Sequence, residues 1–390
     1  MTNTAAMRIA LSAALMLAVA MGIGRFAFTP LLPMMQKDAG LSLGLGGWLA
    51  TANYVGYLMG AYSATHLRFR PARVAPLSLL ATALLTAAMA WTQAPAAWMA
   101  LRFLAGVASA WVLIFTSAWA LHRLAALAAP GLRGVVFSGV GLGIMLAGLL
   151  CIWFLQAGWS SARSWIALGV TALLLSLVSA PAIARRNLEA VQTAHMPPVG
   201  RAGAREVLAL ALAYGIFGFG YIIPATFLPA MAKQRIPDPA VFGWAWPLFG
   251  LAGLVSTLIA GRLMVRYSNR GVWGVSHLIM GAGVVLPLLL GGMTGIVLSA
   301  LCVGGTFMVI TSAGIQEARR LMPHDPAPLM AKLTVAFALG QILGPLCVSL
   351  LPAGPGSLAG LLLTAAVLLA ASGLSLLLSR REAAAGLSEP

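Results

Sequence analysis

Long apolar segments separated by short polar ones run through the whole chain of 390 residues. Their approximate ranges are 8–34, 44–66, 74–93, 96–122, 134–158, 163–183, 206–231, 241–265, 272–291, 294–318, 329–352 and 355–379. Each has about 20 residues or more, enough for a helix to cross ~30 Å of hydrocarbon. Because the backbone finds no water inside a bilayer, each segment is predicted to be a helix. The pattern predicts an all-α membrane protein with twelve transmembrane helices.

The first and seventh segments share a spacing that indicates an internal duplication. Two glycines, a Leu-Pro pair and a lysine recur at a constant offset of 196 residues: Gly22 with Gly218, Gly24 with Gly220, Leu32-Pro33 with Leu228-Pro229, and Lys37 with Lys233. Between these matched positions Arg25 is replaced by Tyr221. The two halves therefore share a scaffold and differ in charge at Arg25, which makes this position the first candidate for function.

The repeat divides the chain into two predicted six-helix bundles. The first covers residues 1–184, a polar cytoplasmic linker covers 185–205, and the second bundle covers 206–390. Of the 24 Lys and Arg residues, 18 lie on the side that holds both termini, four lie on the opposite side, and two lie inside segments. Since positive loops stay in the cytoplasm, this bias predicts that both termini are cytoplasmic.

Composition agrees with a polytopic membrane protein. Hydrophobic residues make up 61% of the chain and charged residues only 8%, against about 25% charged residues in soluble domains. The net charge of +16 does not indicate nucleic-acid binding, because the basic residues lie in the gaps between apolar segments rather than on one face.

The chain lacks the residue patterns of common enzymes. Its three cysteines, Cys151, Cys302 and Cys347, lie in apolar segments without metal-ligand spacing, which is typical of inert packing. It has no Ser/His/Asp or Cys/His set and no phosphate-binding Gly-Lys-Ser/Thr motif. We expect no catalytic residue, no metal site and no cofactor.

Two six-helix halves joined on the cytoplasmic side are typical of alternating-access transporters. The fourth segment contains Arg102-Phe-Leu-Ala-Gly106, and Gly261-Arg-Leu-Met-Val-Arg266 ends the eighth. With these motifs the chain resembles the major facilitator superfamily over essentially its whole length, although Val265 stands where the loop motif has an acid. The resemblance implies the major facilitator fold.

Three further stretches resemble the YbfB/YjiJ branch of that superfamily. They are Gly22 to Gln36, Ala225-Thr-Phe-Leu-Pro229 and Gly340-Gln-Ile-Leu-Gly-Pro345. Membership of this branch implies a multi-pass transporter of the bacterial inner membrane whose substrate is poorly defined. The chemistry of the substrate must therefore be inferred from polar residues inside the segments.

Arg25 is the principal candidate for substrate recognition. A charge inside a transmembrane segment costs several kcal/mol unless it faces a cavity or a partner. Three interpretations are open: a clamp for a carboxylate or phosphate, a lock between helices, and a side chain that reaches the outer interface. The bidentate donors of a guanidinium favour the clamp.

Polar and aromatic residues in other segments complete the predicted substrate site: Phe28, Asn53, Tyr57, Tyr221, Trp246 and Gln341. Asn53 and Tyr57 are four residues apart and so share a helix face. Asn53, Tyr57 and Gln341 could instead form interhelical hydrogen bonds. Aromatic residues near a span end, such as Trp244, more often belong to an interfacial belt, and Trp246 lies deeper than Trp244.

Arg102, His122 and Glu317 are the predicted gating or coupling residues. The triplets Thr116-Ser-Ala and Thr311-Ser-Ala align at an offset of 195, which places His122 and Glu317 at matching cytoplasmic helix ends. These two residues could pair across the halves, or Glu317 could pair with neighbouring arginines. Both could instead be ordinary helix-end residues, and Arg102 could be structural. Glu317 is the candidate for a coupled proton.

The sequence thus predicts a secondary active transporter of a small organic solute, with an anionic or carboxylate-bearing solute preferred. Its expected partners are that solute, the lipid bilayer and a coupled proton, and it is expected to act as a monomer without nucleic acid. One alternative is efflux of hydrophobic drugs through an aromatic, Met-lined cavity. A polytopic membrane enzyme or sensor is the alternative from another class. No acid lies at the middle of a segment, which disfavours a proton/cationic-drug antiporter.

Overall fold

The computed structural model describes residues 2–66, 71–184, 203–235, 238, 243–323, 326–350 and 357–385. In the first half the elements are α1 (Thr2–Leu17), η1 (Ala18–Arg25), α2 (Phe28–Asp38), α3 (Leu43–His66), α4 (Pro71–Ala88), η2 (Met89–Trp91), α5 (Pro95–Ala126), η3 (Pro130–Leu132), α6 (Arg133–Gln156), α7 (Ser161–Ser179) and α8 (Pro181–Ala184). In the second half they are α9 (Ala204–Arg235), α11 (Ala245–Arg266), α12 (Asn269–Leu289), α13 (Gly292–Leu321), α14 (Ala327–Leu350) and α15 (Ser357–Ala385). Most of the predicted linker, residues 185–202, lies outside the described residues.

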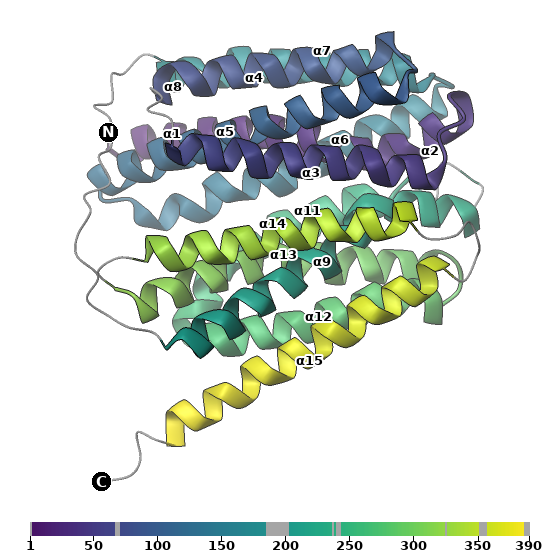
Figure 1. Ribbon diagram of the computed structural model, residues 1–390. Coiled ribbons are helices and arrows are strands. Elements are labelled where there is room, and N and C mark those ends of the chain that lie inside the picture. The colour runs from purple at the N-terminus through teal and green to yellow at the C-terminus, as the bar shows by residue number, and fades with distance from the viewer. Residues whose placement is uncertain are drawn as a thin grey trace.

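Long helices arranged side by side make up the described chain (Figure 1). Eleven of the spans that they form are long and apolar enough to cross a membrane, α1, η1 and α2 together counting as one span. The twelfth, α3, has 24 residues but contains Asn53, Tyr54 and Tyr57, and these polar residues lower its mean hydropathy. The prediction of an all-α membrane protein with twelve transmembrane helices is confirmed.

The two halves of the chain lie next to each other as separate groups of helices, purple and blue above, green and yellow below (Figure 1). They meet where α3 packs on α14, α6 on α11, and α2 on α9. Gly141 and Gly250 make the α6–α11 contact possible. A Cβ on Gly141 would lie 2.3 Å from the Leu254 nitrogen, and one on Gly250 would lie 2.3 Å from the Met145 nitrogen. Only glycine allows the backbones of the two halves to approach so closely.

The first span is not the regular helix that its apolar pattern predicts. Ala18–Arg25 forms a π-helix, and Phe26 and Ala27 form a turn before α2 begins. The N–H of Thr29 bonds to the carbonyl of Phe26 at 3.1 Å, and Pro30 has no N–H to offer. The regular hydrogen-bond ladder is therefore interrupted directly after Arg25, and such interruptions frequently occur at functional sites.

The two ends of the helix bundle differ in charge. We call one the basic end, where α6 starts at Arg133 and α13 ends after Arg319 and Arg320. The other we call the Lys37 end, where α2 ends after Lys37. In Figure 1 the N-terminus lies at the left and α2 at the right.

Candidate functional site

Glycines place the π-helix η1 against the rest of the first half. A Cβ on Gly22 would lie 2.2 Å from the backbone carbon of Gly143, and a Cβ on Gly24 would lie 2.3 Å from a methyl carbon of Thr82. The segment Ala18–Arg25 is buried throughout. Close packing on both sides fixes the direction in which the Arg25 side chain leaves the helix.

Arg102 of α5 supports this interrupted backbone. Its guanidinium donates hydrogen bonds to the carbonyl oxygens of Gly24, at 3.1 Å, and Arg25, at 2.8 Å. The Arg25 carbonyl lacks its usual helical partner, because the Thr29 N–H bonds elsewhere. Asn53 of α3 in turn donates to the Arg102 carbonyl at 2.8 Å. Arg102 therefore occupies a structural position beneath Arg25.

The guanidinium of Arg25 lies between the two halves, surrounded by aromatic rings. Its centre is 4.0 Å from the ring centroid of Tyr57, 5.0 Å from that of Tyr54 and 5.2 Å from that of Phe26. Its Nη2 donates to the Gln341 side-chain oxygen at 2.7 Å. Such cation–π contacts contribute roughly 2 kcal/mol each where water is excluded. They stabilise the cation without neutralising it.

Arg25 has no acidic partner in the described part of the chain. The ion pairs found there join Arg270 and Arg320 to Glu206 and Glu317. Only 2% of Arg25 is exposed, and its Nε has no hydrogen-bond partner. A buried, unneutralised charge with a free donor is costly unless a ligand completes it.

Gln341 connects Arg25 to its repeat-related position in the other half. Its amide nitrogen donates to the Tyr221 hydroxyl at 2.6 Å, while its oxygen accepts from Arg25. The Tyr221 ring lies between those of Phe307 and Phe337, with centroids 5.8 and 5.7 Å away. One amide thus bridges the two positions at which the halves differ.

Trp246 is completely buried at the edge of this group. Its ring centroid is 6.2 Å from that of Phe26 and 4.9 Å from that of Phe249. Its indole N–H has no partner. Phe26 contacts both Arg25 and Trp246. The indole of Trp246 therefore extends the aromatic shell, the group of rings around the Arg25 guanidinium.

The Lys37 end is closed above this site by contacts between the halves. Thr29 donates to the Ala225 carbonyl at 2.8 Å, and the hydroxyls of Tyr54 and Thr226 are 3.1 Å apart. Lys233 donates to the Pro33 carbonyl at 2.8 Å. Thr29 and Ala225 are 196 residues apart, the offset of the sequence repeat, so α2 and α9 meet at equivalent positions.

At the basic end, Glu317 belongs to an ion-pair cluster within the second half. It is 1% exposed and accepts from Arg270 at 2.6 Å, from Arg320 at 2.7 and 2.9 Å, and from Asn269 at 3.3 Å. Arg270 also pairs with Glu206. His122 is exposed and makes no contact with this cluster. Of the two pairings considered for Glu317, the structure has the one with neighbouring arginines.

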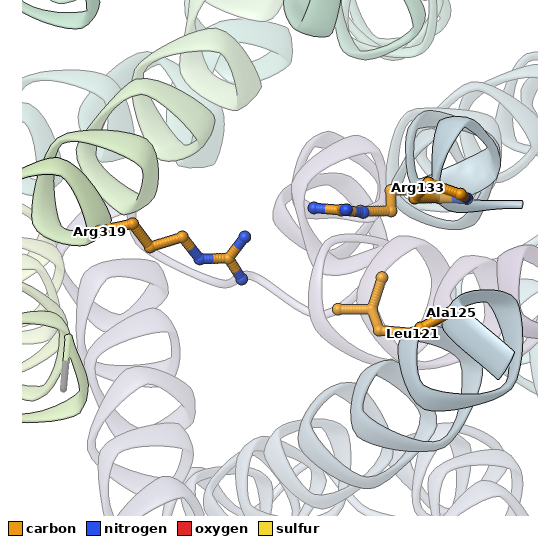
Figure 2. Close-up of a pocket in the computed structure, with 5 residues that line it drawn as sticks. Leu121, Ala125, Arg133 and Arg319 are labelled. Carbon is orange, nitrogen blue, oxygen red and sulfur yellow. The ribbon is translucent and has the colours of Figure 1, made fainter. Parts of the chain in front are cut away.

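A cavity of about 230 Å³ opens between the halves at the basic end. It is lined by Leu121, Ala125, Pro130, Arg133 and Arg319. The first four come from α5, η3 and α6, and Arg319 comes from α13. Figure 2 shows Arg133 and Arg319 reaching into this space from opposite sides. The bundle is thus closed at the Lys37 end and open between its halves at the basic end.

The structure brings together four of the predicted substrate-binding residues and places the others around them. Arg25, Tyr57, Gln341 and Tyr221 form one connected group. Phe28 instead lies over Arg102, with 5.1 Å between its ring centroid and the guanidinium, because the π-helix alters the angle between Arg25 and α2. Asn53 also contacts Arg102 rather than Arg25.

The sequence did not single out four aromatic residues of the site. Phe26 and Tyr54 lie beside Arg25, and Phe307 and Phe337 lie beside Tyr221. Tyr54 is next to Asn53 on a helix with several polar residues, so the pattern alone could not separate it from Tyr57. In the described part of the chain, no group of three or more His, Cys, Asp or Glu residues is arranged to hold a metal ion. The chemistry of the site is that of a cation in an aromatic shell.

Comparison with known proteins matches most of the chain to one family. Residues 17–377 match the model described as "Uncharacterised MFS-type transporter YbfB". No curated protein is similar enough in sequence to count as a match.

Solved structures of the nucleoside transporter NupG share the fold. A mutant form of NupG has a TM-score of 0.73 at 14% identity, over 95% of this chain and 99% of that chain. A second NupG structure has a TM-score of 0.69 at 12% identity, over 96% of this chain and 98% of that chain. At these identities the similarity concerns the fold alone.

Proposed function

This chain belongs to the family of YbfB-type MFS transporters, and we propose that it transports a small carboxylate-bearing organic solute. It is an integral, multi-pass membrane protein. In the proposal the solute's carboxylate binds Arg25, with Tyr57, Tyr221, Gln341 and Trp246 around it. Phe28 and Asn53 contribute indirectly, through their contacts with Arg102.

The observation that carries this proposal is the unneutralised charge of Arg25. The side chain is 2% exposed, has no ion pair with any described acid and keeps an unpartnered Nε. A carboxylate could accept from Nε and an adjacent Nη in the bidentate geometry that guanidinium groups favour. It would also supply the missing negative charge. An arginine placed only to lock helices would not need a free donor.

Alternating access is supported by the difference between the two ends of the bundle. Thr29, Tyr54 and Lys233 close the Lys37 end through contacts between the halves. The basic end has a cavity between the halves. We take the basic end as cytoplasmic, since loops rich in Lys and Arg stay inside, and the structure is then an inward-facing state. The proposed bundles are residues 1–184 and 206–390.

The proposed location is a bacterial inner membrane with both termini in the cytoplasm. A Cys-free protein with Lys37→Cys should react with an impermeant thiol reagent added outside intact cells. One with Val265→Cys should react only after the cells are opened, although Val265 is 91% exposed. The opposite labelling pattern would reverse the orientation and the inward-facing assignment.

Transport of planar hydrophobic compounds is a second candidate. The rings of Phe26, Tyr54, Tyr57 and Trp246 around Arg25 could stack on such a ligand. A solved structure with the same fold is named as a nucleoside transporter, and the base of a nucleoside is planar. A planar neutral ligand would leave Arg25 unneutralised, so this candidate is less well supported.

Thermal unfolding of the purified protein separates the two candidates. Each member of a carboxylic-acid library would be compared with its neutral carboxamide, because a ligand that binds the folded state raises the melting temperature. Carboxylates should stabilise the wild type, their amides should not, and Arg25→Ala should abolish the difference. Equal stabilisation by acid and amide would favour the planar-compound candidate.

A further inference from the structure

The cavity at the basic end contains two arginines that have no described counter-ion. Arg133 lines it from the first half and Arg319 from the second. Among the described residues these are the only charged ones in the lining, which otherwise consists of Leu121, Ala125 and Pro130. Figure 2 shows both guanidinium groups in the space between the halves. The cavity is therefore positively charged on both walls.

The two acids described at this end, Glu206 and Glu317, already form ion pairs. Glu317 accepts from Arg270 and Arg320, and Glu206 pairs with Arg270. Neither Arg133 nor Arg319 forms an ion pair with any described residue. The described carboxylates at this end, Glu206 and Glu317, thus lie together in one ion-pair cluster. Neither of them lines the cavity.

The position of Arg133 adds an independent observation. It is the first residue of α6, a helix of 24 residues without an acid in its first turn. A helix N-terminus carries partial positive charge and favours anions, so a cation there is unfavourable by itself. The N–H of Arg133 bonds to the Pro130 carbonyl, so an anion in front of Arg133 would interact with the side chain and with the partial positive charge of the helix end rather than with this N–H.

We propose that this cavity is an oxyanion-binding site in which one carboxylate, sulfate or phosphate group bridges Arg133 and Arg319. The inference rests on the proposed function in one respect, since it adds a second binding site, at the cytoplasmic end, for the same carboxylate-bearing solute. It does not depend on Arg25. Because the two arginines belong to different halves, the bound anion links the halves and favours closure of the basic end.

Alkylation of a cysteine in the cavity wall tests the site. Leu121→Cys would be placed in a protein whose native cysteines are replaced, purified in detergent and treated with a neutral maleimide. Sodium sulfate would be compared with sodium chloride at the same ionic strength, so that general screening of charge is equal. Sulfate should slow the reaction at least threefold. A cysteine in place of Thr4, exposed at the start of α1, should be unaffected.

Substitution of the arginines locates the effect. Arg133→Gln and Arg319→Gln should each remove the protection by sulfate, and Arg133→Lys should keep part of it. Arg133→Glu should slow alkylation without sulfate, because the introduced carboxylate pairs with Arg319. Protection that persists in both glutamine variants, or no sulfate-specific effect in the parent protein, would overturn the proposal.

Two further arms identify the source of the anion and separate this proposal from the previous one. Succinate, with succinamide as its neutral control, shows whether carboxylates occupy the site as sulfate does. Protection by succinate supports the solute as occupant, and protection by sulfate alone supports an inorganic anion. Arg25→Ala should retain the protection, so failure of the Arg25 clamp leaves this site standing. Loss of protection in Arg25→Ala would show that the anion binds near Arg25 instead and would overturn the cavity site.

Discussion

The two halves of this protein have the same scaffold but place different chemistry at equivalent positions. Arg25 and Tyr221 are 196 residues apart in a repeat of that period. Gln341 bonds to both. In the first half, Arg25 lies at the end of a π-helix that is followed by a turn. In the second half, Tyr221 lies within α9, which runs without interruption from Ala204 to Arg235. The repeat thus places two side chains at equivalent positions, and only the one from the first half, Arg25, is charged.

The difference in backbone follows the difference in side chains. Arg102 donates to the carbonyls of Gly24 and Arg25 in the first half. Because those carbonyls are released from the helical ladder, a second arginine can bind them and remain buried without an acid. Tyr221 needs no such support, since its ring packs between two phenylalanines. The buried arginine of the first half thus lies on a modified helix, and the tyrosine at the equivalent position lies on a regular one.

Removal of Arg25 should have the largest effect on transport. Arg25→Ala removes the two hydrogen bonds that Arg25 is proposed to donate to the solute's carboxylate. The affinity for the solute should fall by about 3 kcal/mol, or roughly a hundredfold. Arg25→Lys should also weaken binding, because an ammonium cannot reproduce the planar fork. Uptake of a radiolabelled solute into proteoliposomes measures the effect. Unchanged uptake by folded Arg25→Ala protein would remove Arg25 from the site.

The helix ends at His122 and Glu317 offer a second comparison of matched positions. Glu317→Gln should lower the free energy of unfolding by about 2 kcal/mol, because Arg270 and Arg320 lose a buried negative charge and one of its two acceptor oxygens. His122→Gln should have almost no effect, since His122 is exposed. Melting temperatures in detergent test both. Equal, small shifts would mean that the Glu317 cluster is an ordinary surface contact.

Gln341→Glu tests whether the bridge must be neutral. The substitution places a carboxylate where Gln341 now accepts from Arg25 at 2.7 Å. An internal ion pair should compete with the solute's carboxylate and reduce transport about tenfold, which is ~1.4 kcal/mol. It should also raise the melting temperature, whereas Gln341→Leu should lower it by leaving Arg25 unpartnered. Transport that tolerates the glutamate would contradict the carboxylate clamp.

Apolar periodicity and the repeat were sufficient to predict the twelve helices, because bilayer thickness and backbone hydrogen bonding leave few alternatives. The same reasoning identified Arg25, since a charge in an apolar segment is conspicuous. It could not place Phe28, which lies over Arg102, because a π-helix is invisible to a 3.6-residue pattern. It could not distinguish the two pairings of Glu317, because they depend on how the halves meet.

Tyr221→Phe should have the smallest effect and tests the comparison most finely. The variant keeps the ring between Phe307 and Phe337 and loses only the hydroxyl that accepts from Gln341 at 2.6 Å. One hydrogen bond between neutral groups contributes about 1 kcal/mol, so transport should fall roughly fivefold. The matched control is Tyr214→Phe, a tyrosine that is also buried in α9 but lies outside the bridge. If Tyr221 only fills space, both variants should behave alike. If it orients Gln341 toward Arg25, Tyr221→Phe alone should raise the KM for the solute, because the amide is then free to turn away from the guanidinium. A fall as large as that of Arg25→Ala would mean that the two halves contribute equally to recognition, contrary to the asymmetry argued above.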